Sequence, residues 1–428
     1  MNYDETLHYL YNALPVFHKI GGAAYKEGLD NTLALDERFN HPHTHYKTIH
    51  IAGTNGKGSI SHTLAAVFQS AGYKTGLYTS PHLLDFRERI RVDGQMISKE
   101  YVVEYVARNK EFFEQLQPSF FELTMMMAFC YFESQKVDIA LIEVGLGGRL
   151  DSTNVITPEL AIISNISFDH MQFLGDTLEK IAGEKAGIIK PHIPVVIGEA
   201  GSSEVKSVFQ QKAAQEEAPI FFAEEEQPLL AATKCTGGWI YDTKDYKQLE
   251  GELGGLAQKK NTVTVLSALK VLKERGFMLP DAAVYKGFKE VTSLTGLMGR
   301  WQVVRKYPKV ICDTGHNSGG IQYVAEQLRQ EQYRNLRIVI GMVNDKDITA
   351  VLKFLPTEAI YYFTKADIPR ALGEQLLHEQ ALLFGLQGHD FPSVKEAVAK
   401  ALQDCDPDDL LFIGGSNFII AEALPLFQ

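Results

Sequence analysis

A glycine-rich turn that contains a lysine, GTNGKGS at residues 53–59, has the composition of a phosphate-binding loop. An apolar run precedes it and a run with helical spacing follows it, so the turn joins a strand to a helix. Such turns bind phosphate because backbone N–H groups and the helix N-terminus face the anion. The common pattern has a glycine six residues before the lysine, but here that position is Ile51. The loop is therefore shortened in its first half; the alternative is a glycine-rich turn without a ligand.

Three ionisable residues further along the chain stand at positions suited to phosphate chemistry. Glu143 lies near the end of an apolar strand, at the edge where open α/β sheets bind ligands, and a carboxylate there suits Mg²⁺. His170 comes just after the next strand, and Lys185 lies in a predicted helix. Each also has an ordinary explanation, namely a salt bridge for Glu143, a structural role for His170 and a solvated surface position for Lys185.

Three arginines alternate in the segment FRERIRV, which predicts a cationic face. In an extended strand Arg87, Arg89 and Arg91 point to the same side. Such a face favours an anionic ligand, although a solvated hairpin explains the pattern equally well. Phe120 and Phe121 follow later and fit either a stacking surface or the core.

The elements that must position these residues alternate between strands and helices. Nearly continuous apolar runs predict buried strands at 48–53, 137–145, 160–167 and 194–200. Helical spacing is found at 59–72 and 99–116. This βαβ alternation predicts a doubly wound α/β domain with a mostly parallel sheet.

The alternation restarts in the last third of the chain, so we predict two domains. The first covers residues 1–297 and includes a small antiparallel insertion at about 215–258, where short alternating pieces and glycines occur. A glycine-containing linker at 292–304 leads to the second domain, residues 298–428. Strands are expected there at 309–315, 336–343, 359–366 and 410–416, which makes it a smaller, Rossmann-like α/β unit.

Composition narrows the classes of protein and partner. The 428 residues are 45% apolar and 22% charged, as in soluble globular proteins. A net charge of −11 argues against a nucleic acid or an anionic membrane as the main partner. The four cysteines are far apart and the N-terminus lacks the pattern of a signal peptide. We therefore expect a cytoplasmic protein that acts on small molecules.

The phosphate loop and a series of later motifs resemble one family. GTNGKGS resembles the phosphate loop of the Mur ligase superfamily, the ATP-dependent ligases that join amino acids to a carboxylate. YTSPHL (78–83), ERIRV (88–92), EVGLGGRLDSTNV (143–155), SFDHMQFLG (167–175) and EKAGIIK (184–190) resemble folylpolyglutamate synthase and its bifunctional relative, dihydrofolate synthase. GRWQ (299–302), DTGHN (313–317), GMVNDKDI (341–348) and GGSNF (414–418) extend the resemblance into the second domain.

The resemblance implies a role for each matching residue. ATP contacts are implied for Gly53, Thr54, Asn55, Gly56, Lys57, Gly58, Ser59, Asn261, Arg300 and Asp313. Metal ligation is implied for Ser80, Glu143 and His170, and catalysis for Lys57, Lys185 and His316. Lys185 is the position that often carries a carbamate in the superfamily. Substrate contacts are implied for Gly28, Leu29, Arg89, Phe121, Glu122, Leu150, Asp151, Ser152 and Ser416. For His316 and Ser416, turn roles remain the alternative.

The implied reaction is ligation of L-glutamate to dihydropteroate and to folate γ-carboxylates through an acyl phosphate, with ATP and two Mg²⁺ ions as cofactors. We expect a Mur-type ATP-binding domain followed by a Rossmann-like ligase domain, acting as a monomer. The competing hypotheses are a Mur-type ligase for another carboxylate, a P-loop kinase or ATPase, and a nucleotide-binding scaffold.

Overall fold

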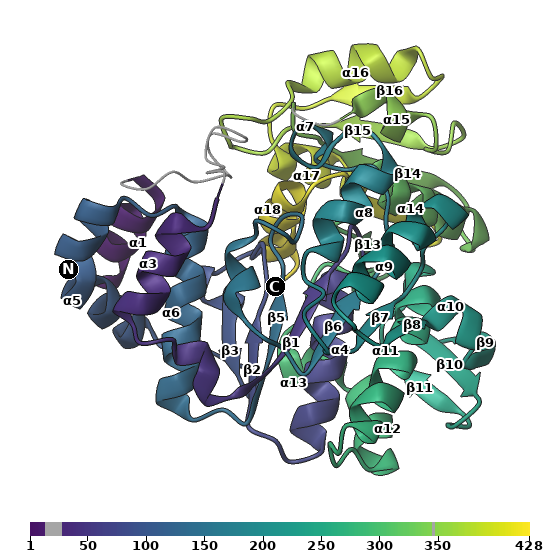
Figure 1. Ribbon diagram of the computed structural model, residues 1–428. Coiled ribbons are helices and arrows are strands. Elements are labelled where there is room, and N and C mark those ends of the chain that lie inside the picture. The colour runs from purple at the N-terminus through teal and green to yellow at the C-terminus, as the bar shows by residue number, and fades with distance from the viewer. Residues whose placement is uncertain (13–27, 345–346) are drawn as a thin grey trace. The chain divides into compact units, whose positions relative to one another are not determined.

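The computed structural model describes residues 1–12, 28–344 and 347–428 (Figure 1). It contains two compact units. Unit 1 comprises Met1–Cys235, Trp239–Glu252 and Gln258–Leu297, and unit 2 comprises Thr236–Gly238, Leu253–Ala257 and Met298–Gln428. The change of unit at Leu297 and Met298 falls inside the segment predicted as a linker, which also contains the short helix α13 (Val291–Thr295) and the start of strand β12 (Gln302–Lys306).

An eight-stranded sheet organises unit 1, with the strand order β4-β3-β2-β5-β1-β6-β7-β8. The strands are β1 (Lys47–Ala52), β2 (Thr75–Tyr78), β3 (Ile90–Val92), β4 (Gln95–Met96), β5 (Ile139–Glu143), β6 (Leu160–Ile163), β7 (Val195–Ile197) and β8 (Ile220–Phe222). The six strands β2, β5, β1, β6, β7 and β8 are parallel to one another, whereas β3 and β4 pair in antiparallel at one edge of the sheet. The central strands are buried along nearly their whole length, which explains their unbroken apolar runs.

Helices cover both faces of this sheet. They are α1 (Tyr3–Asn12), α3 (Asp30–Arg38), α4 (Lys57–Ser70), α5 (Lys99–Leu116), α6 (Phe120–Gln135), α7 (Met171–Leu174), α8 (Leu178–Ala186), α9 (Ser203–Gln215), α10 (Ala223–Glu226), α11 (Ala257–Glu274) and α12 (Asp281–Lys289). Short 3₁₀ turns lie at Pro42–His45, Phe86–Arg89 and Ser152–Val155. One core lies between α6 and the strands β2 and β5, where α1, α3 and α5 also gather (Figure 1). A second core lies between α8, α9 and the strands β6 and β7.

The antiparallel sheet expected at about 215–258 has three strands, β9 (Leu229–Cys235), β10 (Gly238–Thr243) and β11 (Leu249–Gly251). They occupy a shorter part of the chain than the predicted insertion. Residues 220–222, counted in that insertion, form β8 and pair in parallel with β7 of the main sheet.

Unit 2 contains a six-stranded sheet with the order β12-β13-β17-β14-β15-β16. Its further strands are β13 (Lys309–Cys312), β14 (Leu336–Ile340), β15 (Ile360–Phe363), β16 (Gln387–Asp390) and β17 (Leu410–Gly414). Its helices are α14 (Ser318–Gln330), α15 (Ile348–Leu352), α16 (Glu374–Leu382), α17 (Val394–Asp404) and α18 (Asn417–Ala423), followed by a 3₁₀ turn at Leu424–Phe427. The five strands from β13 to β16 are parallel, so the unit is of the α/β class that the sequence predicts.

No helix among the described residues is long and apolar enough to cross a lipid bilayer.

Candidate active site

The glycine-rich turn has the backbone of a phosphate-binding loop between β1 and α4. Gly53 and Gly56 both adopt positive φ angles, +138° and +88°, which glycine tolerates and other residues rarely do. A Cβ atom on Gly53 would lie 1.8 Å from the hydroxyl of Ser164, and one on Gly56 would lie 2.3 Å from the side-chain oxygen of Asn261. These two positions are therefore restricted to glycine by both backbone conformation and space.

The segment after β6 fixes the shape of this loop through reciprocal hydrogen bonds. The N–H groups of Thr54 and Asn55 donate to the backbone and side-chain oxygens of Asn165, both at 3.0 Å. The Thr54 hydroxyl donates to the Ser167 carbonyl and accepts from the Ser167 N–H, both at 3.1 Å. Ser164 donates to the Asn55 carbonyl at 2.5 Å. These protein contacts fix the conformation of the loop.

Lys57 and Ser59 occupy the first turn of α4. The ammonium of Lys57 reaches back over the loop and donates to the carbonyl of Gly53 at 2.9 Å. Gly58 and Ser59 are buried, and the Ser59 hydroxyl accepts from Gln258 at 3.2 Å. Gln258 in turn accepts from the amide of Asn261 at 2.9 Å. Asn261, predicted from the resemblance to contact nucleotide, therefore lies beside the loop, on the first turns of α11.

The three predicted metal ligands lie at or after the ends of strands β2, β5 and β6, which flank β1 in the order β2-β5-β1-β6. Ser80 comes two residues after β2, Glu143 ends β5, and His170 follows β6; all three strands are parallel to β1, which leads into the loop. Glu143 is 4% exposed and pairs in register with Ile51. The Nε2 atom of His170 lies 3.8 Å from a carboxylate oxygen of Asp169. The carboxyl ends of these strands therefore bring oxygen and nitrogen donors to one edge of the sheet.

Lys185 lies in α8 and is buried, with 3% of its surface exposed. Burial and, next, the positive charge of Lys57 lower the pKa of Lys185 to about 7, against partial compensation from Asp169 and Asp151. The ordinary explanation of Lys185 as a solvated surface lysine is therefore wrong for this fold. A large share of this side chain is a neutral amine near neutral pH.

The predicted arginine face is wrong, because residues 86–89 form a 3₁₀ turn rather than a strand. A capping box made by Asp85 and Glu88 closes this turn and changes the directions of the side chains. Arg87 pairs with Asp85 at 2.7 Å, and Arg91 in β3 donates to the carbonyl of Gly94 at 2.9 Å. Arg89, whose guanidinium forms neither of these contacts, is the strongest of the three as a candidate for binding an anion.

Arg89 is buried among aromatic rings, with 2% of its surface exposed. Its Nε atom donates to Nδ1 of His82 at 2.7 Å, and its guanidinium lies over the ring of Phe120 at 5.3 Å. Burial lowers the pKa of Arg89, and the nearby Tyr78, Tyr11 and Glu143 oppose that shift. Within the described residues, its Nη2 atom has no hydrogen-bond partner. A buried guanidinium with an unused donor is suited to an anionic or carbonyl oxygen of a ligand.

Two predicted substrate contacts have evident structural tasks. Glu122 caps α6 by accepting from the N–H of Ser119 at 2.6 Å, and the hydroxyl of Thr32 donates to it at 3.4 Å. Asp151 accepts from the N–H groups of Gly145 and Leu146 at 2.9 and 2.8 Å, which fixes the loop after β5. Burial raises the pKa of Asp151. Their predicted contacts with substrate stay predictions.

The other predicted substrate residues of unit 1 are at least partly accessible. Phe121 packs against Gly145, where an added Cβ atom would lie 2.5 Å from the Phe121 ring. The centroid of the Phe121 ring lies 6.0 Å from that of Tyr78. The rest lie in loops next to helices: Gly28 and Leu29 before α3, and Leu150 and Ser152 around Asp151. Lys26 and Glu27, which directly precede Gly28, lie outside the described residues.

The predicted site residues of unit 2 lie next to three strands: Arg300 precedes β12, Asp313 and His316 follow β13, and Ser416 follows β17. Asp313 accepts from the N–H groups of Trp301 and Gly315, both at 2.8 Å, and burial raises its pKa, while the charge of Arg300 opposes the shift. His316 lies 3.0 Å from the Thr314 carbonyl through Nδ1. Ser416 caps α18 at its N-terminus, a turn role that the sequence left open. Asp345 and Lys346 of the GMVNDKDI motif lie outside the described residues.

Sequence reasoning missed the residues that support the loop. Ser164 and Asn165 fall at the end of a predicted strand, and Ser167 begins a motif from which only His170 was selected. Gln258 was not selected either. The available signal was their position, since polar residues that directly follow a buried parallel strand meet the other loops at the same sheet edge.

Comparisons with known proteins agree with the motifs. The family model described as Mur ligase middle domain matches residues 51–237, and the model described as Mur ligase, glutamate ligase domain matches residues 299–417. A dihydrofolate synthase/folylpolyglutamate synthase of Bacillus subtilis is 37% identical over 417 residues, which cover 93% of this chain and 94% of the relative.

Two solved structures are similar over the full length. The Escherichia coli enzyme in complex with DHPP and ADP has a TM-score of 0.86 and 28% identity, and the match covers 100% of this chain and 97% of that one. A bifunctional folylpolyglutamate synthase/dihydrofolate synthase of Yersinia pestis, complexed with AMPPNP and a Mn ion, has a TM-score of 0.83 and 28% identity, with coverage of 100% and 98%. The chain therefore belongs to the folylpolyglutamate synthase and dihydrofolate synthase family of the Mur ligases.

Proposed function

We propose that this protein is an ATP-dependent ligase that adds L-glutamate to dihydropteroate and to the γ-carboxylate of folates. The carboxylate of the acceptor attacks the γ-phosphorus of ATP, ADP leaves, and an acyl phosphate forms. The amino group of glutamate then attacks the acyl carbon, phosphate leaves, and the ammonium proton is lost to solvent. The names of the relatives and the ligands of the solved structures support this reaction.

One observation of the structure carries the proposal. The buried Glu143 ends the strand beside β1, in register with Ile51, and the buried amine of Lys185 lies near enough to Lys57 of the phosphate loop for that charge to lower its pKa. An ATPase needs the phosphate loop and the carboxylate. The buried Lys185, whose pKa is lowered in part by the charge of Lys57, is a feature that a simple phosphate-binding turn does not explain.

The donors at the sheet edge fit a hard divalent cation such as Mg²⁺. Ser80 and Glu143 offer oxygen atoms from neighbouring strands β2 and β5, and Glu143 is buried at the strand end. His170 would add an imidazole nitrogen, which is a less usual ligand for Mg²⁺. When bound, the ion supplies neutralisation of phosphate charge. Lys57 and the N-terminus of α4 orient the phosphates and stabilise the charge that develops during transfer.

We further propose that Lys185 works as a carbamate. Its neutral amine attacks the carbon of CO₂, a C–N bond forms, and a proton is released to solvent. The product is an anion, which reverses the interaction with Lys57 from repulsion to attraction. Two neighbouring cations, one of them buried, are costly in the unmodified protein, and this change removes the cost.

The acceptor contacts are proposed around Arg89. Its Nη2 atom, which has no hydrogen-bond partner among the described residues, is suited to donate to a polar oxygen of the pterin or pteroate. Phe121, whose ring lies 6.0 Å from that of Tyr78, offers a partly accessible aromatic surface. We also propose a cytoplasmic monomer, in keeping with four cysteines that form no disulfide.

The decisive experiment measures phosphate release from ATP by the purified full-length chain with L-glutamate and Mg²⁺. Three reactions are compared, with dihydropteroate, with tetrahydrofolate and without acceptor, and products are identified by mass. We expect phosphate release that depends on an acceptor, and a product heavier by one glutamate residue. The Lys57→Ala variant should lose both signals, whereas Lys180→Ala, an exposed lysine on α8, should keep them.

The outcomes separate the candidate functions. Release at the same rate without acceptor, and without a glutamylated product, would refute the ligase proposal and favour an ATPase. Glutamate ligation to another carboxylate, with neither of the two acceptors used, would favour a different Mur-type ligase. Product from only one of the two acceptors would restrict the enzyme to that activity.

A further inference from the structure

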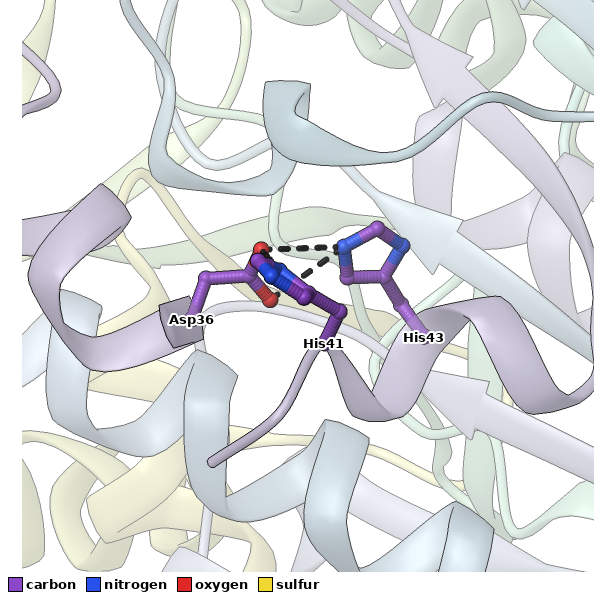
Figure 2. A group of neighbouring side chains, drawn as sticks. All are labelled: Asp36, His41 and His43. Carbon is purple, nitrogen blue, oxygen red and sulfur yellow. Dashed lines mark hydrogen bonds and ion pairs between the residues drawn. The ribbon is translucent and has the colours of Figure 1, made fainter. Parts of the chain in front are cut away.

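A second group of possible metal ligands lies between α3 and β1, at a distance in sequence from the phosphate loop. Asp36 projects from α3, His41 lies in the turn that follows it, and His43 lies in the 3₁₀ turn before β1. Figure 2 shows nitrogen atoms of both rings turned toward the carboxylate of Asp36. One ligand atom from each residue lies within 4.8 Å of the other two.

The backbone of the turn is responsible for this convergence. Asn40 and His41 have positive φ angles of +59° and +53°, a conformation that is uncommon for residues other than glycine. It reverses the chain at the end of α3, and the N–H of His41 donates to the Asp36 carbonyl at 2.9 Å. The reversed chain brings both histidines back over the carboxylate that α3 presents.

The carboxylate itself has unused capacity for a ligand. Asp36 is 5% exposed. Its Oδ2 atom lies 2.6 Å from Nδ1 of His41 and 3.3 Å from Nε2 of His43. Its Oδ1 atom lies 3.2 Å from Nε2 of His43, yet within the described residues it accepts no hydrogen bond. A buried carboxylate oxygen without a donor is costly, and a cation would satisfy it.

The spacing fits a small transition-metal ion. Bonds of about 2.0–2.1 Å in a tetrahedral arrangement place neighbouring ligand atoms about 3.3 Å apart. The two distances from His43 to the carboxylate already have this value. The contact of His41 would have to lengthen by about 0.7 Å from its 2.6 Å. That movement is available because 54% of the His41 side chain is exposed.

We propose that Asp36, His41 and His43 form a binding site for a divalent transition-metal ion of the zinc type, with water as the remaining ligand. Two imidazoles and one carboxylate favour such an ion over Mg²⁺, which prefers oxygen ligands. The bound ion joins the C-terminal end of α3 to the turn that leads into β1. The site braces the fold at that point, and glutamate ligation does not depend on it.

The test is a titration of the full-length protein with Zn²⁺ in competition with a chromophoric chelator, in excess Mg²⁺ to occupy the oxygen-rich edge of the sheet. We expect one tight equivalent in the wild-type protein. Asp36→Asn, His41→Asn and His43→Gln should each weaken it by about 100-fold or more. Asparagine is chosen at position 41 because it tolerates the positive φ angle. Co²⁺ should give the intense visible bands of a tetrahedral site.

His45 offers a matched control. It stands two residues beyond His43, and its Nδ1 atom lies 2.6 Å from Glu133, away from Asp36. His45→Gln should retain the tight equivalent and the Co²⁺ spectrum. Equal affinity in the wild-type protein and the three site variants would overturn the proposal, as would absence of any tight equivalent in the wild-type protein. Circular dichroism checks folding, and the exposed His41→Asn variant decides the outcome if the buried variants unfold.

Discussion

The carbamate proposed on Lys185 leads to a quantitative prediction that follows from the lowered pKa of the amine. With a pKa of about 7, about one tenth of the amine is neutral at pH 6, half at pH 7 and nine tenths at pH 8. At constant dissolved CO₂ the rate of carbamate formation should therefore rise about tenfold from pH 6 to pH 8 and then level off. A solvated lysine, with the ordinary pKa of 10.5, would show a rise of about a hundredfold without a plateau.

The assay starts from enzyme freed of CO₂ at low pH. Reactivation is followed by acceptor-dependent phosphate release after addition of ¹³C-bicarbonate, and the carbamate carbon is observed directly by NMR. Lys185→Ala should lack both signals, and a short carboxylic acid should restore part of its activity. Lys180→Ala should behave as the wild-type protein does.

The same residue predicts a change of stability with pH. Because the folded pKa lies below the unfolded value, the unmodified ammonium destabilises the fold fully below pH 7, and this cost disappears as pH rises toward 10.5. In CO₂-free buffer, Lys185→Met should therefore raise the free energy of unfolding by a few kcal/mol at pH 6 and by little near pH 10. A hundredfold rise in the rate of carbamate formation from pH 6 to pH 8, without a plateau, would refute this reasoning. So would a gain in the stability of Lys185→Met that does not depend on pH.

Substitutions at three further positions, Gly53, Arg89 and Glu122, test the site. Gly53→Ala should lower kcat/KM by about 100-fold, because the added Cβ atom has no room. The control Gly183→Ala, in open space on α8, should leave kcat/KM unchanged and raise the free energy of unfolding by about 0.5–1 kcal/mol. Arg89→Met should raise the KM for the acceptor by about 10–100-fold and leave the KM for ATP unchanged. The control Arg87→Ala should change neither KM. Equal effects of Arg89→Met on both KM values would contradict the proposed contact between Arg89 and the acceptor. Glu122→Ala should lower the free energy of denaturant unfolding by about 1 kcal/mol, and Glu122→Gln should keep the cap. A raised KM for the acceptor in the Gln variant, without loss of stability, would therefore indicate a substrate contact of the carboxylate.

The central part of unit 1 could be predicted because its signals are local. Continuous apolar runs identify β1, β5 and β6, and the order of strand, glycine-rich turn and helix identifies the loop. The polar strand β16, with the sequence QGHD, and the edge strand β12 lack such runs and were not predicted. Their pairing is set by neighbours that are distant in sequence.

At the site, some errors had a readable cause. The spacing of Asp85 and Glu88 is that of a capping box, which indicates a turn instead of the extended strand that was assumed for the arginines. Lys185 follows Ile181 by four residues and so lies on the buried face of α8. The position of Asn165 after a buried strand indicated the sheet edge, but its pairing with the phosphate loop could not be predicted, because that pairing depends on β6 lying beside β1.

The reciprocal hydrogen bonds between residues 53–55 and 164–167 have a consequence for protein engineering. The phosphate loop owes its shape to a second chain segment more than a hundred residues away, and that same segment leads directly into His170. If the heptapeptide alone were inserted into another strand–helix junction, it would carry the glycines and the lysine but would lack the hydrogen-bond partners in residues 164–167 that fix its conformation. The smallest transferable module is therefore a pair of segments, and we expect a change in either to alter both the proposed nucleotide contacts and the proposed metal ligand His170.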